Sequence, residues 1–290
     1  AECEALTAGR PDAEGVAVCQ RIDLIPRAAF LTLGVRCLAE ALTLEELCAQ
    51  IAALPLEAER FRVEYLSLWP KNPLPKPQVV LAVANALQAY PDLSDPQHRF
   101  LVAAQAERLW FGEILAEPAR DYREHDTKPY RTSSSLPARL ARALVNLVAP
   151  PAQSILDPFC GTGSILLEAC SLGLQSYGMD NNIKMRGMSR HNLTHFGYTA
   201  SVELGDAQNC MQSADAIVTD LPYGRLLEQD RQALQRVLQH TAQLAPQAVY
   251  LAEEDITPWL IDAGYTHVEC YRVRKRHAMS RFVHHAWREL

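Results

Sequence analysis

The stretch LDPFCGTGSILLEA, residues 156–169, decides the fold of this 290-residue chain. A short apolar run over 154–156 leads into it, and the apolar positions from Ser164 onward have helical spacing, so the motif is a strand, a tight turn and a helix. Gly161 and Gly163 permit the turn and let a ligand approach the backbone closely. The sequence therefore predicts an α/β fold with a ligand site at the carboxyl ends of its strands.

Strands and helices alternate around this motif. A helix is expected before it, over 137–147. The elements expected after it are strands at 176–179, 201–204, 216–219, 268–273 and 282–287 and a helix over 181–196. Such alternation predicts a parallel sheet with helices on both faces, because parallel strands need crossover connections. The last two strands are joined by a short basic loop, so they must form an antiparallel hairpin.

The N-terminal part of the chain has a different pattern, typical of a separate α+β unit. Its expected strands are 16–22, 28–35, 61–68, 100–105 and 109–115, and its expected helices are 43–54 and 78–90. The polar stretch 117–136 contains two prolines and three consecutive serines, which is the composition of a linker. We therefore predict an N-terminal region at 1–116, a linker at 117–136 and a second domain at 137–290.

Composition excludes several classes of protein. The formal net charge is −6, the wrong sign for a protein whose affinity rests on broad contact with phosphates. Residues 1–120 hold 11 basic and 16 acidic side chains, against 17 and 18 in residues 121–290, so the acidity lies mainly in the N-terminal part.

The same survey bears on location and metals. Residues 1–10 lack the basic segment and apolar core of a signal peptide, and no later apolar run approaches the length of a membrane span. The eight cysteines show no paired short spacing of the kind found in zinc or redox motifs. We therefore expect a cytoplasmic protein with reduced cysteines and no metal.

Acidic residues follow the next two strands and favour a nucleoside ligand. Asp180 ends the strand after the motif, 23 residues beyond Asp157, where a carboxylate can accept hydrogen bonds from ribose hydroxyls. Asp206 ends the third strand and could accept from an adenine amino group. A dinucleotide fingerprint needs a third small residue where Leu166 stands, and the turn has no lysine for a phosphate-binding loop, so both alternatives are disfavoured. A glycine-rich turn without a ligand remains the plain alternative.

The motif DLPYG, residues 220–224, follows the fourth strand at the same carboxyl edge. The Asp220 carboxylate and the Leu221 carbonyl can accept the two N–H bonds of an exocyclic base amine, which localises its lone pair and aims it at a sulfonium methyl group. Pro222 stiffens the turn, and Tyr223 offers an aromatic face on which a flipped-out base can stack. An ordinary turn with a surface tyrosine is the alternative interpretation.

Together these segments resemble the THUMP-associated RNA methyltransferases, most closely those that methylate guanine N2 in tRNA. The resemblance rests on SSLPARLARALVNL at 134–147, on 156–169, on Asp180 and Asp206, and on DLPYG, and it covers most of the second half. It implies a class I (Rossmann-like) methyltransferase sheet with a C-terminal antiparallel hairpin, preceded by an α+β THUMP-like domain. The residues then expected to hold S-adenosylmethionine are Ser135, Leu136, Asp157, Phe159, Cys160, Gly161, Thr162, Gly163, Asp180, Asn181, Asp206, Ala207 and Asp220, while residues 220–223 hold the target amine.

One departure from the family keeps the substrate open. Many members have two prolines in the catalytic turn, whereas this chain has Leu221 followed by Pro222. Adenine N6 in nucleic acid and a protein glutamine amide present the same NH2 group, and an inactive cofactor-binding RNA-binding protein is the alternative of another class. A cysteine nucleophile at Cys160 is disfavoured, because that residue lies in the cofactor turn and not beside the amine.

Two basic groups are expected to contact RNA phosphates. One surrounds the last hairpin, whose turn should lie at the cofactor edge, and the other mixes basic and aromatic residues in the polar stretch before the second domain. The first group comprises Arg272, Arg274, Lys275, Arg276, His277 and Arg281, and the second comprises Arg123, His125, Lys128, Tyr130 and Arg131. Solvated charged loops are the alternative for both. His284 and His285, in the last strand, are interpreted as structural.

Overall fold

The computed structural model describes residues 1–56, 59–68, 74–105, 107–222, 228–274 and 280–289. The chain folds into two compact units. The larger unit comprises residues 1–6, 27–30 and 119–290, and the smaller unit comprises residues 7–26 and 31–118. This division differs from the expected one in two respects: residues 119–136 belong to the larger unit and do not form a separate linker, and two N-terminal segments belong there as well.

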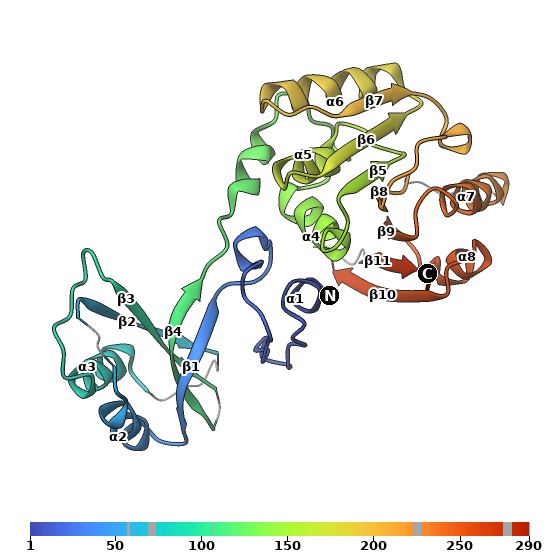
Figure 1. Ribbon diagram of the computed structural model, residues 1–290. Coiled ribbons are helices and arrows are strands. Elements are labelled where there is room, and N and C mark those ends of the chain that lie inside the picture. Colours follow the sequence, from blue (N-terminus) through green and yellow to red (C-terminus); the bar gives the residue numbers. More distant parts are fainter. Residues whose placement is uncertain (57–58, 69–73, 106, 223–227, 275–279, 290) are drawn as a thin grey trace. The chain divides into compact units, whose positions relative to one another are not determined.

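The larger unit is built on a seven-stranded sheet with the order β10-β11-β9-β8-β5-β6-β7 (Figure 1). Its strands are β5 (Ser154–Asp157), β6 (Gln175–Asp180), β7 (Ser201–Leu204), β8 (Ala216–Asp220), β9 (Gln247–Ala252), β10 (His267–Arg274) and β11 (Ser280–Trp287). Strands β5 to β9 pair in parallel, and β11 runs antiparallel to both β9 and β10. The parallel sheet and the C-terminal hairpin predicted from the sequence are confirmed.

Helices cover both faces of this sheet. They are α4 (Ala138–Val148), α5 (Ser164–Ser171), α6 (Ile183–His195), α7 (Glu228–Thr241) and α8 (Thr257–Asp262). Side chains of successive strand residues alternate between the faces: Ile155 packs in the core with α4 and α5, and Leu156 packs in the core with α7 and α8. Because both faces are buried, the inner strands are apolar throughout, as is typical of parallel sheets.

The smaller unit is a four-stranded sheet of order β1-β4-β3-β2 with two helices packed on it. Its elements are β1 (Gly34–Ala41), α2 (Leu44–Ala53), β2 (Phe61–Ser67), α3 (Lys76–Ala86), β3 (His98–Ala104) and β4 (Leu109–Ala116). Strands β2 and β3 are parallel, and the other pairs are antiparallel. Helix α2 begins after Thr43, whose side chain accepts a hydrogen bond from the backbone N–H of Glu46, so the predicted helix start is confirmed.

Two strand predictions near the N-terminus were wrong. Residues 16–22 form no strand, and Val18 is 95% exposed. The expected strand at 28–35 lies later, as β1, because Ala29 and Phe30 belong to the larger unit, where their backbone N–H groups donate to the carboxylate of Glu2 at 2.8 and 2.7 Å. Short apolar runs signal burial, but they do not specify which partner provides it.

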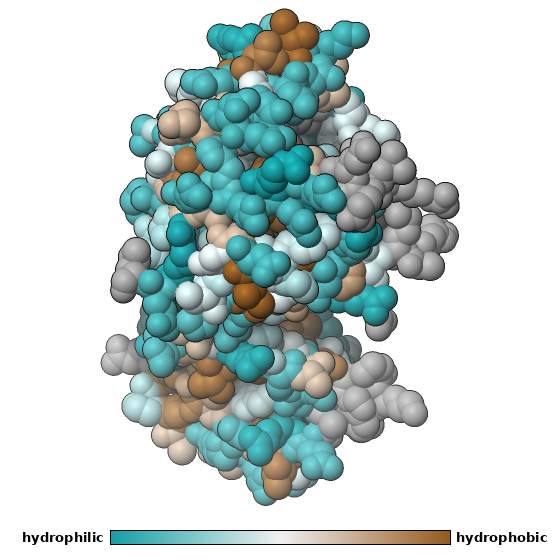
Figure 2. Space-filling view, turned by 90° about the vertical axis from the view of Figure 1, so that its right-hand side faces the viewer, coloured by the Kyte–Doolittle hydropathy of each residue, from teal (hydrophilic) through white to brown (hydrophobic). Residues whose placement is uncertain are grey.

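The remaining elements are short. They are helix α1 (Glu2–Thr7) and the 3-10 turns η1 (Ile25–Arg27), η2 (Asp121–Thr127) and η3 (Ala207–Asn209). Within the described part of the chain, every helix is too short or too polar to cross a membrane. On the face shown in Figure 2, hydrophobic residues form small patches that are separated by hydrophilic ones.

Candidate functional site

Three carboxylates meet at the carboxyl edge of the larger sheet. Asp157, Asp180 and Asp220 are the last residues of β5, β6 and β8, and these strands are parallel neighbours with β5 in the centre. The hydroxyl of Thr219 in β8 donates to the Oδ1 atom of Asp157 at 2.6 Å, which ties the two strand ends together. The carboxyl ends of β5 and β8 therefore lie side by side, as the sequence predicts.

The glycine turn is held by the neighbouring strand ends. The backbone N–H of Gly161 donates to Oδ2 of Asp180 at 2.9 Å. Gly161 and Gly163 have φ values of +51° and +81°, a conformation that other residues adopt at a cost. A Cβ atom at Gly163 would also lie 2.5 Å from the hydroxyl oxygen of Ser189 in α6. The turn therefore leads directly into α5, and at Gly163 it packs closely against α6.

Asp157 has an unusually high pKa for an aspartate. Burial raises its pKa to about 7, and the negative charges of Asp220 and Asp180 add to the increase. Hydrogen bonds from the Thr219 hydroxyl and the Phe159 backbone N–H act in the opposite direction. The cofactor end of the site is thus crowded with carboxylates, which favours a ligand that brings positive charge.

The residues expected to hold a nucleoside are all at this edge. Asp180 accepts from the backbone N–H groups of Gly161 and Asn182 with its two oxygens, at 2.9 and 2.8 Å. A carboxylate has about four acceptor positions, so these bonds leave room for ribose hydroxyls. Asp206 is exposed, accepts from the backbone N–H of Gln208, and precedes the buried Ala207 in η3. This donor and acceptor set fits an adenosine group.

The turn after β8 begins with a largely buried ion pair. Asp220 is bound by the guanidinium of Arg281 in β11, and burial lowers the pKa of that guanidinium while Asp220 counteracts the effect. Leu221 is buried and donates its backbone N–H to the carbonyl of Leu251 in β9 at 3.0 Å, whereas Pro222 is exposed. Tyr223 lies outside the described residues. The sequence predicts Asp220 and Leu221 as a pair, but it gives no sign of Arg281 beside them.

The segment before α4 is bonded to the glycine turn. The hydroxyl groups of Ser135 and Thr162 lie 3.0 Å apart, and the side-chain amide of Asn192 donates to the carbonyls of Thr162 and Tyr130, both at 2.9 Å. Leu136 is buried in the core formed with α4 and α5. Residues 119–136 thus run over the surface of the larger unit with most of their side chains exposed, and their polar and buried side chains support the turn from the side.

A buried charge network lies beneath this segment. Glu168 of α5 is fully buried and is bonded by Nδ1 of His125 at 2.7 Å and by Nε of Arg142 at 2.8 Å. Burial raises the pKa of Glu168, and its two basic partners oppose the increase. The sequence gives no sign of this network, because charged residues on a helix or in a polar stretch ordinarily indicate a solvated surface.

The residues expected to contact RNA differ in their exposure to solvent. Lys128 is only 3% exposed, and its ammonium donates to the hydroxyl of Ser164 at 2.8 Å, so it is not placed for phosphate contact; burial lowers its pKa. Arg123 and Arg131 are exposed. On the hairpin, Arg272 is exposed and Arg274 ends β10, whereas Lys275 and Arg276 lie outside the described residues.

The described end of the hairpin lies at the carboxyl edge, as expected. Phe282 of β11 pairs with both Arg272 of β10 and Ala252 of β9, and the residue before Ala252 pairs with Asp220. The exposed Arg272 is therefore near the same carboxyl edge of the sheet as Asp220. The described strand ends on either side of residues 275–279 therefore lie at the same edge as Asp220.

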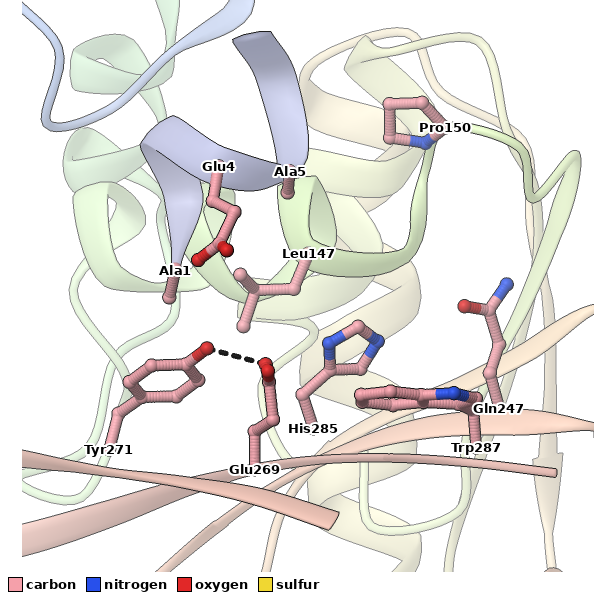
Figure 3. A pocket seen from close by; sticks show the side chains of 10 residues that line it. All are labelled: Ala1, Glu4, Ala5, Leu147, Pro150, Gln247, Glu269, Tyr271, His285 and Trp287. Carbon is pink, nitrogen blue, oxygen red and sulfur yellow. Dashed lines mark hydrogen bonds between the residues drawn. The ribbon is translucent and has the colours of Figure 1, made fainter. Parts of the chain in front are cut away.

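A separate cavity of about 300 Å³ lies at the opposite edge of the sheet (Figure 3). Gln247, the first residue of β9, pairs with Trp287, the last residue of β11, and both line the cavity. The other lining residues are Ala1, Glu4, Ala5, Leu147, Pro150, Glu269, Tyr271 and His285. The cavity is at the amino ends of the parallel strands and is distinct from the candidate site.

Comparison with known proteins identifies the class to which this architecture belongs. Residues 123–254 match the family model UPF0020, described as the RMKL-like methyltransferase domain. This range includes the segment before α4, the glycine turn, Asp180, Asp206 and the turn after β8. Residues 123–254 are therefore similar to a methyltransferase domain of the RMKL-like family.

Two relatives that share one enzyme name are similar to part of the chain. The chain is similar to a tRNA (guanine(10)-N2)-dimethyltransferase of Pyrococcus abyssi, with 38% identity over 126 residues, which is 40% of this chain and 38% of the relative. It is 44% identical over 101 residues to the enzyme of the same name from Methanothermobacter thermautotrophicus, covering 33% of this chain and 30% of the relative. The matched segment thus spans less than half the length of either protein.

A solved structure resembles the fold over nearly the whole chain. The crystal structure of TrmN from Thermus thermophilus aligns with a TM-score of 0.53 and 22% sequence identity, covering 99% of this chain and 95% of that one. The likeness supports the class I α/β fold of the larger unit and extends over the smaller unit as well.

Proposed function

We propose that the chain transfers a methyl group from S-adenosylmethionine to the exocyclic N2 of a guanosine in RNA, with tRNA as the substrate class. One observation carries the proposal: the glycine turn after β5 and the turn beginning at Asp220 open at adjacent strand ends of the same sheet edge. A cofactor on the first turn would therefore face an amine held by the second. The names of the guanine-N2 relatives support the choice of base.

The cofactor would be held chiefly by backbone and carboxylate groups. Gly161 and Gly163 allow close approach of its methionine part, with Thr162 and Ser135 beside them, and Asp180 and Asp206 would accept from ribose and adenine. The carboxylates of Asp157 and its neighbours suit the positive charge of a sulfonium compound. When bound, the cofactor supplies an electrophilic methyl group.

The protein's part in the reaction is positioning. The Asp220 carboxylate and the Leu221 carbonyl would accept the two N–H bonds of the amine, so that the nitrogen lone pair turns away from the ring and toward the methyl carbon. In the transfer, the amine nitrogen would form a bond to the methyl carbon while the carbon–sulfur bond breaks and its electrons pass to sulfur. The methylated nitrogen then loses a proton, so no strong base is required.

RNA binding is assigned in the same proposal to exposed basic residues and to the smaller unit. Arg123 and Arg131 are in the segment before α4, which supports the glycine turn, and Arg272 lies on the hairpin at the carboxyl edge. Tyr223 would stack the flipped base. The smaller unit, an α+β domain, would have the THUMP-like role of presenting the RNA.

The test is methyl transfer with identification of the product. The chain is incubated with methyl-labelled S-adenosylmethionine and, in separate reactions, with tRNA, ribosomal RNA, DNA and a protein extract, and the products are digested for mass spectrometry. We expect N2-methylguanosine from tRNA. Formation of N6-methyladenosine or N-methylglutamine would show that the site methylates a different amine. Cofactor binding without any methyl incorporation would indicate an inactive RNA-binding protein.

A further inference from the structure

The ion pair between Arg281 and Asp220 joins two strands that are not neighbours. Asp220 of β8 pairs with Leu251 of β9, and Leu251 pairs with Val283 of β11. Arg281 lies two residues before Val283, on the same face of β11 and toward the carboxyl edge. Its side chain therefore passes the end of β9 to reach the first residue of the amine-binding turn.

We propose that Arg281 is a positioning residue for methyl transfer: it holds the Asp220 carboxylate ionised and correctly turned to accept the N–H bonds of the target amine. The inference rests on the proposed function. The side chains of Arg281 and Asp220 are only 11% and 14% exposed, so solvent screens their attraction weakly. A guanidinium remains charged at all working pH values, and its planar fork restricts the orientation of the carboxylate.

The surroundings of Asp220 explain why a cation is needed there. The Asp157 carboxyl on β5 is close enough to interact electrostatically with both Asp220 and Asp180, and Glu253 follows β9 at the same edge. A buried carboxylate among other carboxylates takes up a proton readily. A protonated Asp220 would present an O–H donor to the amine where an acceptor is required. Among the described charged groups flanking Asp220, Arg281 supplies the positive charge.

The structure also separates this role from the one suggested by the sequence. Arg281 belongs to the basic stretch around the hairpin, which was interpreted as a phosphate-docking surface, yet its side chain is turned inward onto Asp220. An ordinary surface pair in the same unit, Arg231 with Glu254, has side chains that are 42% and 44% exposed. Pairs of that kind contribute little, whereas removing one partner of a buried pair leaves the other uncompensated.

The experiment compares Arg281→Met, which removes the charge, with Arg281→Lys, which keeps it. Arg231→Met is the matched control. For Arg281→Met we expect kcat at neutral pH to fall by about tenfold to a hundredfold, as a misplaced reacting group does. The acidic limb of the pH–kcat profile should move to higher pH, while the cofactor Kd changes by less than about threefold. Arg281→Lys keeps the charge but not the planar fork, so it should keep the wild-type limb with a kcat between those of Arg281→Met and the wild type, and Arg231→Met should match the wild type.

Several outcomes would overturn the inference. An Arg281→Met enzyme with the wild-type kcat and pH limb would show that the charge is unnecessary, and equal loss of activity and cofactor binding would show a merely structural role. A double-mutant cycle of Asp220→Asn and Arg281→Met, followed by chemical unfolding, tests the pair without activity, and additive effects would contradict it. If the wild type methylates nothing, the proposed function fails by itself, and the unfolding cycle still reports on the pair.

Discussion

The two units handle charge in opposite ways. In the larger unit, charged side chains are buried inside the domain, among them Asp157, Glu168 and Arg142. In the smaller unit, the core is apolar, and ion pairs such as Arg108 with Glu40 lie on the surface. Burying a charge costs free energy unless it is paired, so the buried charges of the larger unit impose a free-energy cost that an apolar core would avoid. The comparison points to the segment before α4 and the carboxyl edge as the parts shaped by function.

The largest effect should come from Asp220→Ala, which removes a carboxylate at the carboxyl edge of the larger unit. Loss of the carboxylate removes an acceptor of the target amine, so we expect the methyl-transfer rate to fall by at least about a hundredfold. Cofactor affinity should stay within about threefold, because the adenosine-binding carboxylates are on other strands. Single-turnover transfer and equilibrium cofactor binding measure the two effects. Parallel loss of both would mean that Asp220 holds the cofactor and not the amine.

The next effect tests the cost of burial directly. Arg142→Met leaves Glu168 buried with His125 as its remaining basic partner, and we expect the free energy of unfolding to fall by about 3–5 kcal/mol. The matched change in the smaller unit, Arg108→Met, breaks a pair whose side chains are 56% and 47% exposed. That change should cost about 0–1 kcal/mol. Denaturant unfolding measures both, and similar losses would remove the distinction between the units.

The pH dependence of stability gives a smaller effect with a definite sign. Folding raises the pKa of Asp157 from 3.8 to about 7, so the folded state holds this proton more tightly than the unfolded chain. The stabilisation is fully present below about pH 4 and is lost as the pH rises through about 7, with a total on the order of 1–4 kcal/mol. Asp157→Asn removes the titrating group. The difference between the wild-type and variant unfolding curves should therefore slope between these pH values, and parallel curves would contradict the assignment.

Local sequence patterns predicted the carboxyl edge because its parts are local. A strand, a glycine turn and a helix follow one another within residues 154–171, and parallel strands bring Asp157, Asp180 and Asp220 to one edge wherever the helices pack. The elements β9, α7 and α8 were not predicted individually. Helix α7 is mostly polar, and the short apolar run of β9 does not distinguish a strand from a buried helix segment.

What could not be predicted depends on contacts between distant residues. Arg281 and Asp220 are 61 positions apart, and alternation along a strand does not say which face a basic side chain occupies. Lys128 lies in a polar stretch, and only its bond to Ser164 of α5 reveals that it is buried. The strand expected from residue 28 begins later for a similar reason, because the backbone N–H of Ala29 donates to the distant Glu2 carboxylate. In each case tertiary packing overrides the local pattern.

The smallest effect separates backbone conformation from close packing in the glycine turn. Gly163 and Gly173, at the two ends of α5, have similar φ values of +81° and +77°, but only at Gly163 would a Cβ atom meet a neighbour, the Ser189 hydroxyl at 2.5 Å; at Gly173 nothing lies within 4 Å. Gly173→Ala should cost about 1–2 kcal/mol through its backbone conformation alone. Gly163→Ala should cost about 1–3 kcal/mol more, because α6 must shift.

Cofactor binding gives the sharper readout of the same pair. The displaced turn in Gly163→Ala should weaken cofactor affinity by about tenfold or more, which corresponds to about 1.4 kcal/mol. Gly173→Ala should bind as the wild type does, since that residue is at the far end of α5. Calorimetry on both variants, below their unfolding temperatures, measures the difference. Equal affinities would show that the turn adapts to the added methyl group, and the role of Gly163 would then reduce to its backbone angle.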